Sequence, residues 1–356
     1  MKKRQLKRLL SLFLAVIMTT GLLPVSVFAV AGDPVTSDWI TAANQALVND
    51  QFVRSEILSD TIPNTDLYYY YYSKEYRDEG TSGIVTAQAI IIVPTEGGSN
   101  LSIPDYSSST DPSIPWGKVS GLTHVYIAEG VTGIGDFAFQ SKTSIETFSI
   151  QDPSQFTEVG KYALAGLTAD MRFGDDGTDT DLDLSNLTKL GEGAFAGTSL
   201  DCSVTLGADL TAKEDETVAH KVADSAFQSC GLTGITFSAP SSITAIGADA
   251  FYGNRSISSI DLPDSLTTIG ARAFQAGVMN SFNTNVTHLE IPAFVTSIGE
   301  NAFSGYRNLE SVDVLADSIT ISNGAFGTNS YTAKTNGSIL GLTKEQYQAW
   351  LKDTSQ

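Results

Sequence analysis

The sequence predicts a repeat solenoid of about eight coils, with short parallel strands on its concave face, and three observations support this fold class. A hexapeptide of the form I-G-x-x-A-F recurs in eight copies along the chain. A second apolar pattern, L-x-x-I-x-I, lies between successive copies. The last residues of successive hexapeptides are 25, 31, 32, 24, 23, 29 and 23 residues apart. A nearly constant period of this length is typical of solenoids, whose insertions lie in loops.

The hexapeptide is interpreted as the part of each coil that fills the interior. Its copies span residues 134–139, 159–164, 190–195, 222–227, 246–251, 269–274, 298–303 and 321–326. One coil is too small to bury its own apolar face, so we expect the coils to stack about 4.8 Å apart. The glycine is expected to permit a tight turn that a Cβ would obstruct. The last position predicts one buried column that contains Phe139, Phe195, Phe227, Phe251, Phe274, Phe303 and Phe326.

The L-x-x-I-x-I pattern is interpreted as a short strand in each coil. Its last two apolar positions are two residues apart, which is the interval at which side chains return to the same face of a strand. Clear copies span residues 122–127, 145–150, 232–237, 257–262, 286–291 and 309–314. The copies near Met171 and Val204 are degenerate, and they are flanked by the two longest spacings.

The residues between the apolar positions of these strands are candidate ligand contacts. They point out of the concave sheet, and stacking turns each position into a column along the solenoid. One column becomes acidic over its last three copies. A solvated face whose charges only discourage aggregation is an equal alternative. The candidate binding residues are Thr123, His124, Tyr126, Ser149, Arg172, Thr236, Asp261, Glu290, Glu310 and Asp313, with Thr205 added by an uncertain alignment.

Residues 290–292 (E-I-P), 295–303 (V-T-S-I-G-E-N-A-F) and 309–314 together resemble the BspA-type leucine-rich repeat. The unit of that family reads approximately L-x-x-I-x-I-P-x-x-V-T-x-I-G-x-x-A-F-x-x-C. The resemblance covers about residues 103–330, and the motif is specific because it recurs. It implies an α/β-type leucine-rich repeat solenoid in a bacterial secreted or cell-surface protein, one that adheres to proteins of a host or of a neighbouring cell.

Only Cys230 keeps the cysteine with which the unit of that family ends. The equivalent positions of other copies hold Lys142, Thr198, Asn254, Gly277 and Tyr306, so no cysteine ladder is expected. Two cysteines are too few for a disulfide scaffold. Cys202 and Cys230 lie 28 residues apart, about one repeat, and two buried thiols are favoured over a disulfide between them.

The first 29 residues are predicted to be a secretory signal peptide. Five positive charges precede an apolar run from Leu9 to about Leu23, and small-residue cleavage sites follow at Ala29 and Ala31. A retained membrane anchor is the alternative, but the run is short for a spanning helix and Pro24 closes it. We therefore expect a secreted, extracellular protein, released or associated with the cell surface, with no membrane span in the mature chain.

The mature chain is predicted to be strongly acidic. Removing the leader takes away five of the 21 Lys and Arg and none of the 40 Asp and Glu, which leaves 16 minus 40, a formal charge of −24. Such a charge argues against binding of nucleic acid or anionic lipid through a broad basic face. It favours solubility and attraction to cationic partners.

The segments outside the repeats are predicted to close the ends of the solenoid. In a mixed N-terminal cap, residues 38–58 predict a helix and residues 84–93 a strand. The tyrosine run 68–72 predicts a strand with one set of rings on the core and the other set either solvated or exposed for stacking. The predicted divisions are a signal peptide (1–29), an N-terminal cap or module (32–119), the solenoid (120–327) and a C-terminal cap (328–356).

No catalytic, metal or cofactor site is predicted. The only histidines are His124, His220 and His288, and the first and last occupy the same unit position six coils apart, so they cannot share a site. The acidic run 175–183 fails as a calcium-binding EF-hand loop, because Leu184 and Leu190 stand where Gly and Glu are required. The rival enzyme class is a right-handed β-helix that acts on polysaccharides, which would need reactive residues from adjacent coils converging in a cleft.

The sequence therefore predicts a non-catalytic, monomeric, adhesin-like solenoid that binds an extracellular protein through its concave sheet. The alternative is a carbohydrate-binding extracellular module, with Tyr126 and the run 68–72 as stacking surfaces. Neither a nucleic-acid partner nor a cofactor is expected.

Overall fold

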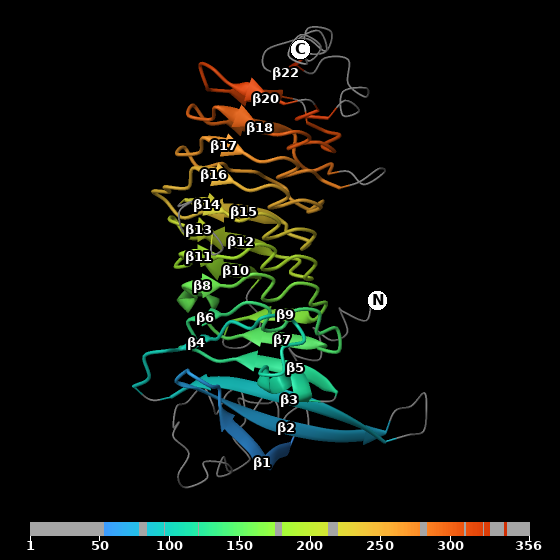
Figure 1. Ribbon diagram of the computed structural model, residues 1–356. Helices are drawn as coiled ribbons and strands as arrows, with labels where there is room; N and C mark the ends of the chain where they lie inside the picture. The colour runs from blue at the N-terminus through green and yellow to red at the C-terminus, as the bar shows by residue number, and fades with distance from the viewer. Residues whose placement is uncertain are drawn as a thin grey trace, which may run out of the picture. The chain divides into compact units, whose positions relative to one another are not determined.

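The computed structural model describes residues 53–77, 84–95, 97–119, 121–174, 180–212, 220–277, 283–309, 311–322, 324–327 and 338–339. These residues belong to one compact unit, 37–356. Within it the chain forms a stack of coils whose strands follow one another in sequence order (Figure 1). The predicted solenoid is confirmed, whereas the number of about eight coils and the domain boundaries stay predictions. The signal peptide, Glu310 and all of the C-terminal cap except 338–339 lie outside the described residues.

Three long strands precede the first repeat strand. β1 (Val53–Thr61) and β2 (Leu67–Arg77) pair antiparallel, and so do β2 and β3 (Ile84–Pro94). β3 then pairs in parallel with β5 (Leu122–Ile127). The strand predicted over residues 84–93 is confirmed, because these residues lie in β3. The helix predicted over 38–58 is wrong at residues 53–58, which belong to β1, while its other residues lie outside the described part. β1 pairs with β2 at residues 53–54 and 59–61, with an irregularity between them, and this pairing overrides a weak helix propensity.

The tyrosine run lies in β2. Tyr69 and Tyr71 pack in the core, with ring centroids 5.1 Å apart in an edge-to-face arrangement. Tyr70 and Tyr72 belong to the opposite face of the strand, and only 3% of each residue is exposed. The hypothesis that one set of these rings is available to stack on a ligand is therefore wrong for all four, because both faces of β2 are covered.

The L-x-x-I-x-I segments form longer strands in three sheets. Their strand orders are β1-β2-β3-β5-β7-β9, β10-β12-β15 and β18-β20-β22, and every pairing from β3 onward is parallel. Both degenerate copies are strands, since Met171 lies in β9 and Val204 in β12. The bounds are β7 (Thr147–Ile150), β9 (Asp170–Phe173), β10 (Asp181–Leu184), β12 (Ser203–Leu206), β15 (Gly234–Phe237), β18 (His288–Ile291), β20 (Ser311–Val314) and β22 (Ser338–Ile339).

Two-residue strands form two further sheets. One sheet contains β4 (Ser102–Ile103), β6 (Gly133–Ile134), β8 (Glu158–Val159), β11 (Lys189–Leu190) and β13 (Thr211–Ala212). The other contains β14 (Lys221–Val222), β16 (Ala245–Ile246), β17 (Thr268–Ile269), β19 (Ser297–Ile298) and β21 (Thr320–Ile321). All of these strands except β4 and β13 end on the first residue of a hexapeptide.

The described part of the chain contains no α-helix, although the family resemblance implied an α/β-type repeat. Its helical segments are two 3-10 helices, η2 (Pro115–Lys118) and η3 (Pro153–Gln155). The fourth residue of every hexapeptide has a left-handed backbone, which ends any right-handed helical turn. These residues are Phe137, Tyr162, Gly193, Ser225, Asp249, Arg272, Asn301 and Gly324, with φ from 49° to 67°.

The hexapeptide glycine serves close packing between coils rather than a left-handed turn. Gly270 is not among the residues with positive φ. A Cβ placed on it would lie 2.6 Å from the backbone nitrogen of Ala248 in the preceding coil. The expectation that a Cβ would obstruct this position is confirmed, and the obstructing group is the backbone of the neighbouring coil.

The predicted phenylalanine column is confirmed. Each of the seven rings is at most 1% exposed. From Phe195 to Phe326 successive rings stack with centroids 5.0 to 5.6 Å apart. Leu164 holds this position in the second copy, between Phe139 and Phe195. Trp116 of η2 extends the column, because its ring stacks on Phe139 at 4.7 Å.

The position of the family's cysteine supplies hydrogen-bond donors to the carbonyls of this column. Asn254 Nδ2 donates to the carbonyl of Phe251 at 2.9 Å, and Tyr306 Oη donates to that of Phe274 at 2.8 Å. Cys230 Sγ lies 2.9 Å from the carbonyl of Phe195. Cys202 and Cys230 are both buried free thiols, as expected. Different side chains at this position therefore each give a buried backbone carbonyl a hydrogen-bond donor.

Candidate functional site

The outward residues of the longer strands form columns wherever neighbouring strands pair in register. In the first sheet Tyr126 lies opposite Ser149, and Ser149 lies opposite Arg172. Each is partly exposed, whereas the residues on either side of it in its strand are buried. Arg172 also pairs with Asp170 of its own strand at 3.3 Å. This part of the predicted column is therefore assembled as expected.

The second sheet continues the column with a residue that the sequence analysis missed. Asp183 of β10 lies opposite Thr205, and Thr205 lies opposite Thr236. This register confirms the uncertain alignment of Thr205. The missed signal was the alternation D-L-D-L, because Leu182 and Leu184 are buried while Asp181 and Asp183 are exposed.

The third sheet carries the acidic end. Glu290 lies opposite Asp313 in the register of β18 and β20. His288 Nε2 lies 3.7 Å from Asp313 Oδ2 across the same pair of strands. Asp261 is exposed, but it belongs to a coil without a longer strand, so the predicted single column is divided into three sets. Glu310 lies outside the described residues.

The first coil holds its polar residues in bonds to the neighbouring strand. Thr123 Oγ1 donates to the carbonyl of Gln88 at 3.1 Å, and His124 Nδ1 lies 2.9 Å from Thr123 Oγ1. Both residues are partly exposed. Thr123 therefore joins β5 to the strand before it, and His124 is oriented by Thr123.

Charge is distributed unevenly along the stack. Residues 256–327 contain seven Asp and Glu and only two Lys and Arg. One of the two, Arg272, is already bound to Asp249 by two hydrogen bonds of 2.7 and 2.6 Å. The last coils therefore present a negative surface, and a cationic group is the electrostatic complement of that surface.

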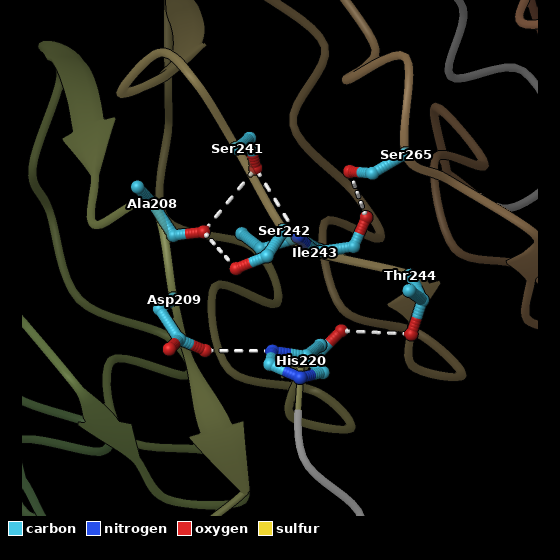
Figure 2. A network of polar contacts seen from close by, with 8 residues as sticks. All are labelled: Ala208, Asp209, His220, Ser241, Ser242, Ile243, Thr244 and Ser265. Carbon is cyan, nitrogen blue, oxygen red and sulfur yellow. Dashed lines mark hydrogen bonds and ion pairs between the residues drawn. The ribbon is translucent and has the colours of Figure 1, made fainter.

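A separate polar network surrounds His220, as Figure 2 shows. His220 Nδ1 lies 2.7 Å from Asp209 Oδ1, and Ser241 and Ser242 lie nearby, which are the residue types of a serine hydrolase. Both hydroxyls instead donate to the carbonyl of Ala208, at 3.4 and 3.1 Å. These bonds join neighbouring coils, so we interpret the network as structural.

The ranges that the structure describes offer few other candidate sites. A shallow groove of about 420 Å³ lies over the two-residue strands, lined among others by Lys221, Asp224 and Gly270. No three His, Cys, Asp or Glu residues there are placed to hold a metal ion. No helix of the described part is long and apolar enough to cross a membrane. The exposed columns are therefore the candidate site.

The repeats match a known family. The model of the BspA-type leucine-rich repeat region matches residues 100–169, 116–221, 176–277 and 220–338, so the matches together cover more than half of the chain. The chain belongs to the BspA-type leucine-rich repeat family. The resemblance seen in residues 290–303 is thereby confirmed. This family of repeats is generally non-catalytic, and its fold is consistent with a protein-interaction module.

Several solved structures are similar to this BspA-type protein. A leucine-rich repeat protein from Bacteroides ovatus has a TM-score of 0.41 and 18% identity, over 71% of this chain and 66% of its own. A leucine-rich cell surface protein from Faecalibacterium prausnitzii has a TM-score of 0.40 and 21% identity, over 76% and 74%. A leucine-rich repeat protein from T. pallidum has a TM-score of 0.34 and 18% identity, over 79% and 92%. Among curated proteins, none matches the sequence.

Proposed function

We propose that this BspA-type protein is a secreted or cell-surface adhesin-like solenoid that binds another protein through the exposed columns, without catalytic turnover. The observation that carries the proposal is the register of the longer strands. It sets outward residues of successive coils side by side, as Tyr126, Ser149 and Arg172 are. Because the buried residues between them fix the strands, the columns form a rigid and varied surface of the kind that specific protein recognition uses.

Secretion is supported by the predicted leader. A monomer is proposed, because a formal charge of −24 on the mature chain opposes self-association. An acidic surface also opposes binding to nucleic acid and to anionic lipid. Catalysis would need reactive groups that converge, whereas His124 and His288 lie on strands of different sheets.

A carbohydrate-binding function is the weaker candidate. Its proposed stacking surface included Tyr69 to Tyr72, and these rings are buried. Tyr68, the first residue of the run 68–72, and Tyr126 keep partial exposure, but they lie on β2 and β5, which do not pair with each other. Ser149, which lies opposite Tyr126, is not aromatic. Two partly exposed rings on separate strands are a small platform for a sugar.

The experiment that separates the two classes is parallel binding of the mature chain to a panel of extracellular-matrix proteins and to a glycan array. We expect saturable binding to at least one protein of the panel and no saturable binding to any glycan. Binding to glycans alone, with no protein bound, would contradict the proposal.

A further inference from the structure

We propose that the acidic end of the binding surface continues onto an apolar corner formed by Phe294 and Leu315. We infer that it binds a protein segment in which an apolar side chain is flanked by Lys or Arg. The inference rests on the proposed function and specifies the partner class. Among the described residues, these two are the exposed large apolar side chains, with 67% and 52% of each residue accessible to solvent.

The register places both side chains on one corner of adjacent coils. The Leu315 N–H donates to the carbonyl of Ile291 at 3.0 Å, which extends the pairing of β18 and β20 by one residue and sets Leu315 opposite Pro292. Phe294 follows Pro292 by two residues in the same turn. Phe294 and Leu315 are therefore one coil and two register positions apart, within reach of a single bound segment.

The backbone under the patch is fixed. The Val295 N–H donates to the carbonyl of Pro292 at 3.1 Å, and Val295 is fully buried. Phe294 therefore lies in a turn between Pro292 and Val295, which are both buried. A turn whose backbone is already ordered loses less conformational entropy on binding, which favours Phe294 as an anchor.

Acidic residues surround the corner. Glu290 and Asp313 precede it on β18 and β20 and are exposed. The segment from the end of β18 to the end of β19 has the same length as the segment from the end of β20 to the end of β21. Because β18 pairs with β20 and β19 pairs with β21 in register, the exposed Asp317 lies opposite Phe294. An apolar centre with a charged rim is the anatomy of a binding hot spot.

The sign of this rim selects the occupant. In a symmetric contact between two copies, Glu290, Asp313 and Asp317 would approach the same residues of the other copy, and like charges oppose that contact. The same charges oppose insertion of the corner into an anionic membrane. A polypeptide segment with an apolar side chain between cations satisfies both the centre and the rim.

The test uses three short synthetic peptides with the full chain: one with leucines flanked by lysines, one with serine in place of leucine, and one with glutamate in place of lysine. We expect the first to bind with the highest affinity in fluorescence anisotropy. The double variant Phe294→Ser, Leu315→Ser should lose about tenfold or more in affinity at an unchanged melting temperature. The matched variant Phe294→Leu, Leu315→Met should retain binding.

The outcomes separate this inference from the proposed function. In one outcome the double variant Glu290→Lys, Asp313→Lys loses peptide binding while the serine variant keeps it. That result would overturn the role of the apolar corner and leave the acidic surface as the binding region. Equal binding of the leucine and serine peptides overturns the corner as well. Binding insensitive to both sets of variants contradicts the acidic end itself. Two further results would contradict the assignment of a cationic protein segment to this corner. One is a dimer of the parent chain in sedimentation that disappears in the serine variant, and the other is binding to anionic vesicles that disappears in the same variant.

Discussion

Phe251 lies inside the stacked column, between the rings of Phe227 and Phe274 at 5.6 and 5.1 Å. We predict that Phe251→Ala lowers the free energy of unfolding by about 3–5 kcal/mol, because the lost ring leaves a cavity between coils that cannot collapse. Phe251→Leu is the matched control and should cost less, since the second copy already uses Leu164 there. Denaturant unfolding measures both. An alanine variant as stable as the parent would contradict the stacking.

Gly270 tests how closely the coils approach. We predict that Gly270→Ala lowers the free energy of unfolding by about 1–3 kcal/mol, because its Cβ would meet the backbone nitrogen of Ala248 at 2.6 Å. The fourth copy carries Ala223 at the same position. Ala223→Gly is therefore the control, and thermal unfolding should show only a small change. A neutral Gly270→Ala would show that the backbone can shift at no cost.

The two thiols provide a test of burial. Burial raises the pKa of both Cys202 and Cys230 to about 12. Because the thiolate is the reactive form, neither should be alkylated by iodoacetamide at pH 8 in the folded protein. Mass spectrometry should find both modified after unfolding in guanidinium. Rapid labelling of either cysteine in the folded chain would show that its coil opens.

At the scale of elements, η2 closes one end of the column. Trp116 Nε1 donates to the carbonyl of Ala138 at 2.8 Å, and its ring lies parallel to that of Phe139. In later coils the equivalent alanine carbonyl accepts a hydrogen bond from a backbone N–H of the preceding coil. For example, the Phe251 N–H donates to the carbonyl of Ala273. The indole thus replaces a missing coil and caps the hydrogen-bond ladder.

We predict that Trp116→Phe keeps the ring but costs about 1–3 kcal/mol, because it leaves the buried Ala138 carbonyl without a donor. Hydrogen exchange should become faster around β6 and β8 and stay unchanged around β17 and β19, since each coil touches only its neighbours. Trp116→Leu should accelerate the same region further. A uniform change along the whole stack would contradict the account of a local cap.

The longer repeat strands could be predicted from the sequence, whereas the two-residue strands could not, because so short a segment has no alternation of its own. The spacing of apolar residues predicted β5, β7, β15, β18 and β20. It missed β10, since D-L-D-L begins within the acidic run 175–183, which is equally suited to a solvated loop. Residues 257–262 match the pattern but form no strand.

At the scale of the whole molecule, the candidate site was predictable as residue positions but not as an assembled surface. The alternation within each strand identified the outward residues, and pairing in register confirms their columns in three sets. The first break lies between β9 and β10 and the second at residues 257–262, and the apolar pattern marks neither of them. The corner at Phe294 was missed because only strands were considered. The sequence signal for this corner is an aromatic residue at a turn position. The register of β17 and β19 shows that Ser265 holds the equivalent position in the preceding coil.

The central claim is that the acidic end of the exposed columns recognises a cationic protein surface. The most direct test is titration of a protein ligand from the matrix panel with the parent chain and with the triple variant Asp261→Lys, Glu290→Lys, Asp313→Lys, at several salt concentrations. The control with the same charge change reverses Glu129, Asp201 and Glu300, which are exposed outside the columns. Complementary charges are screened over about 8 Å at physiological salt. The account predicts that the triple variant binds more weakly and with a flatter salt dependence, while the control retains binding; equal affinity of parent and triple variant at every salt concentration would contradict it.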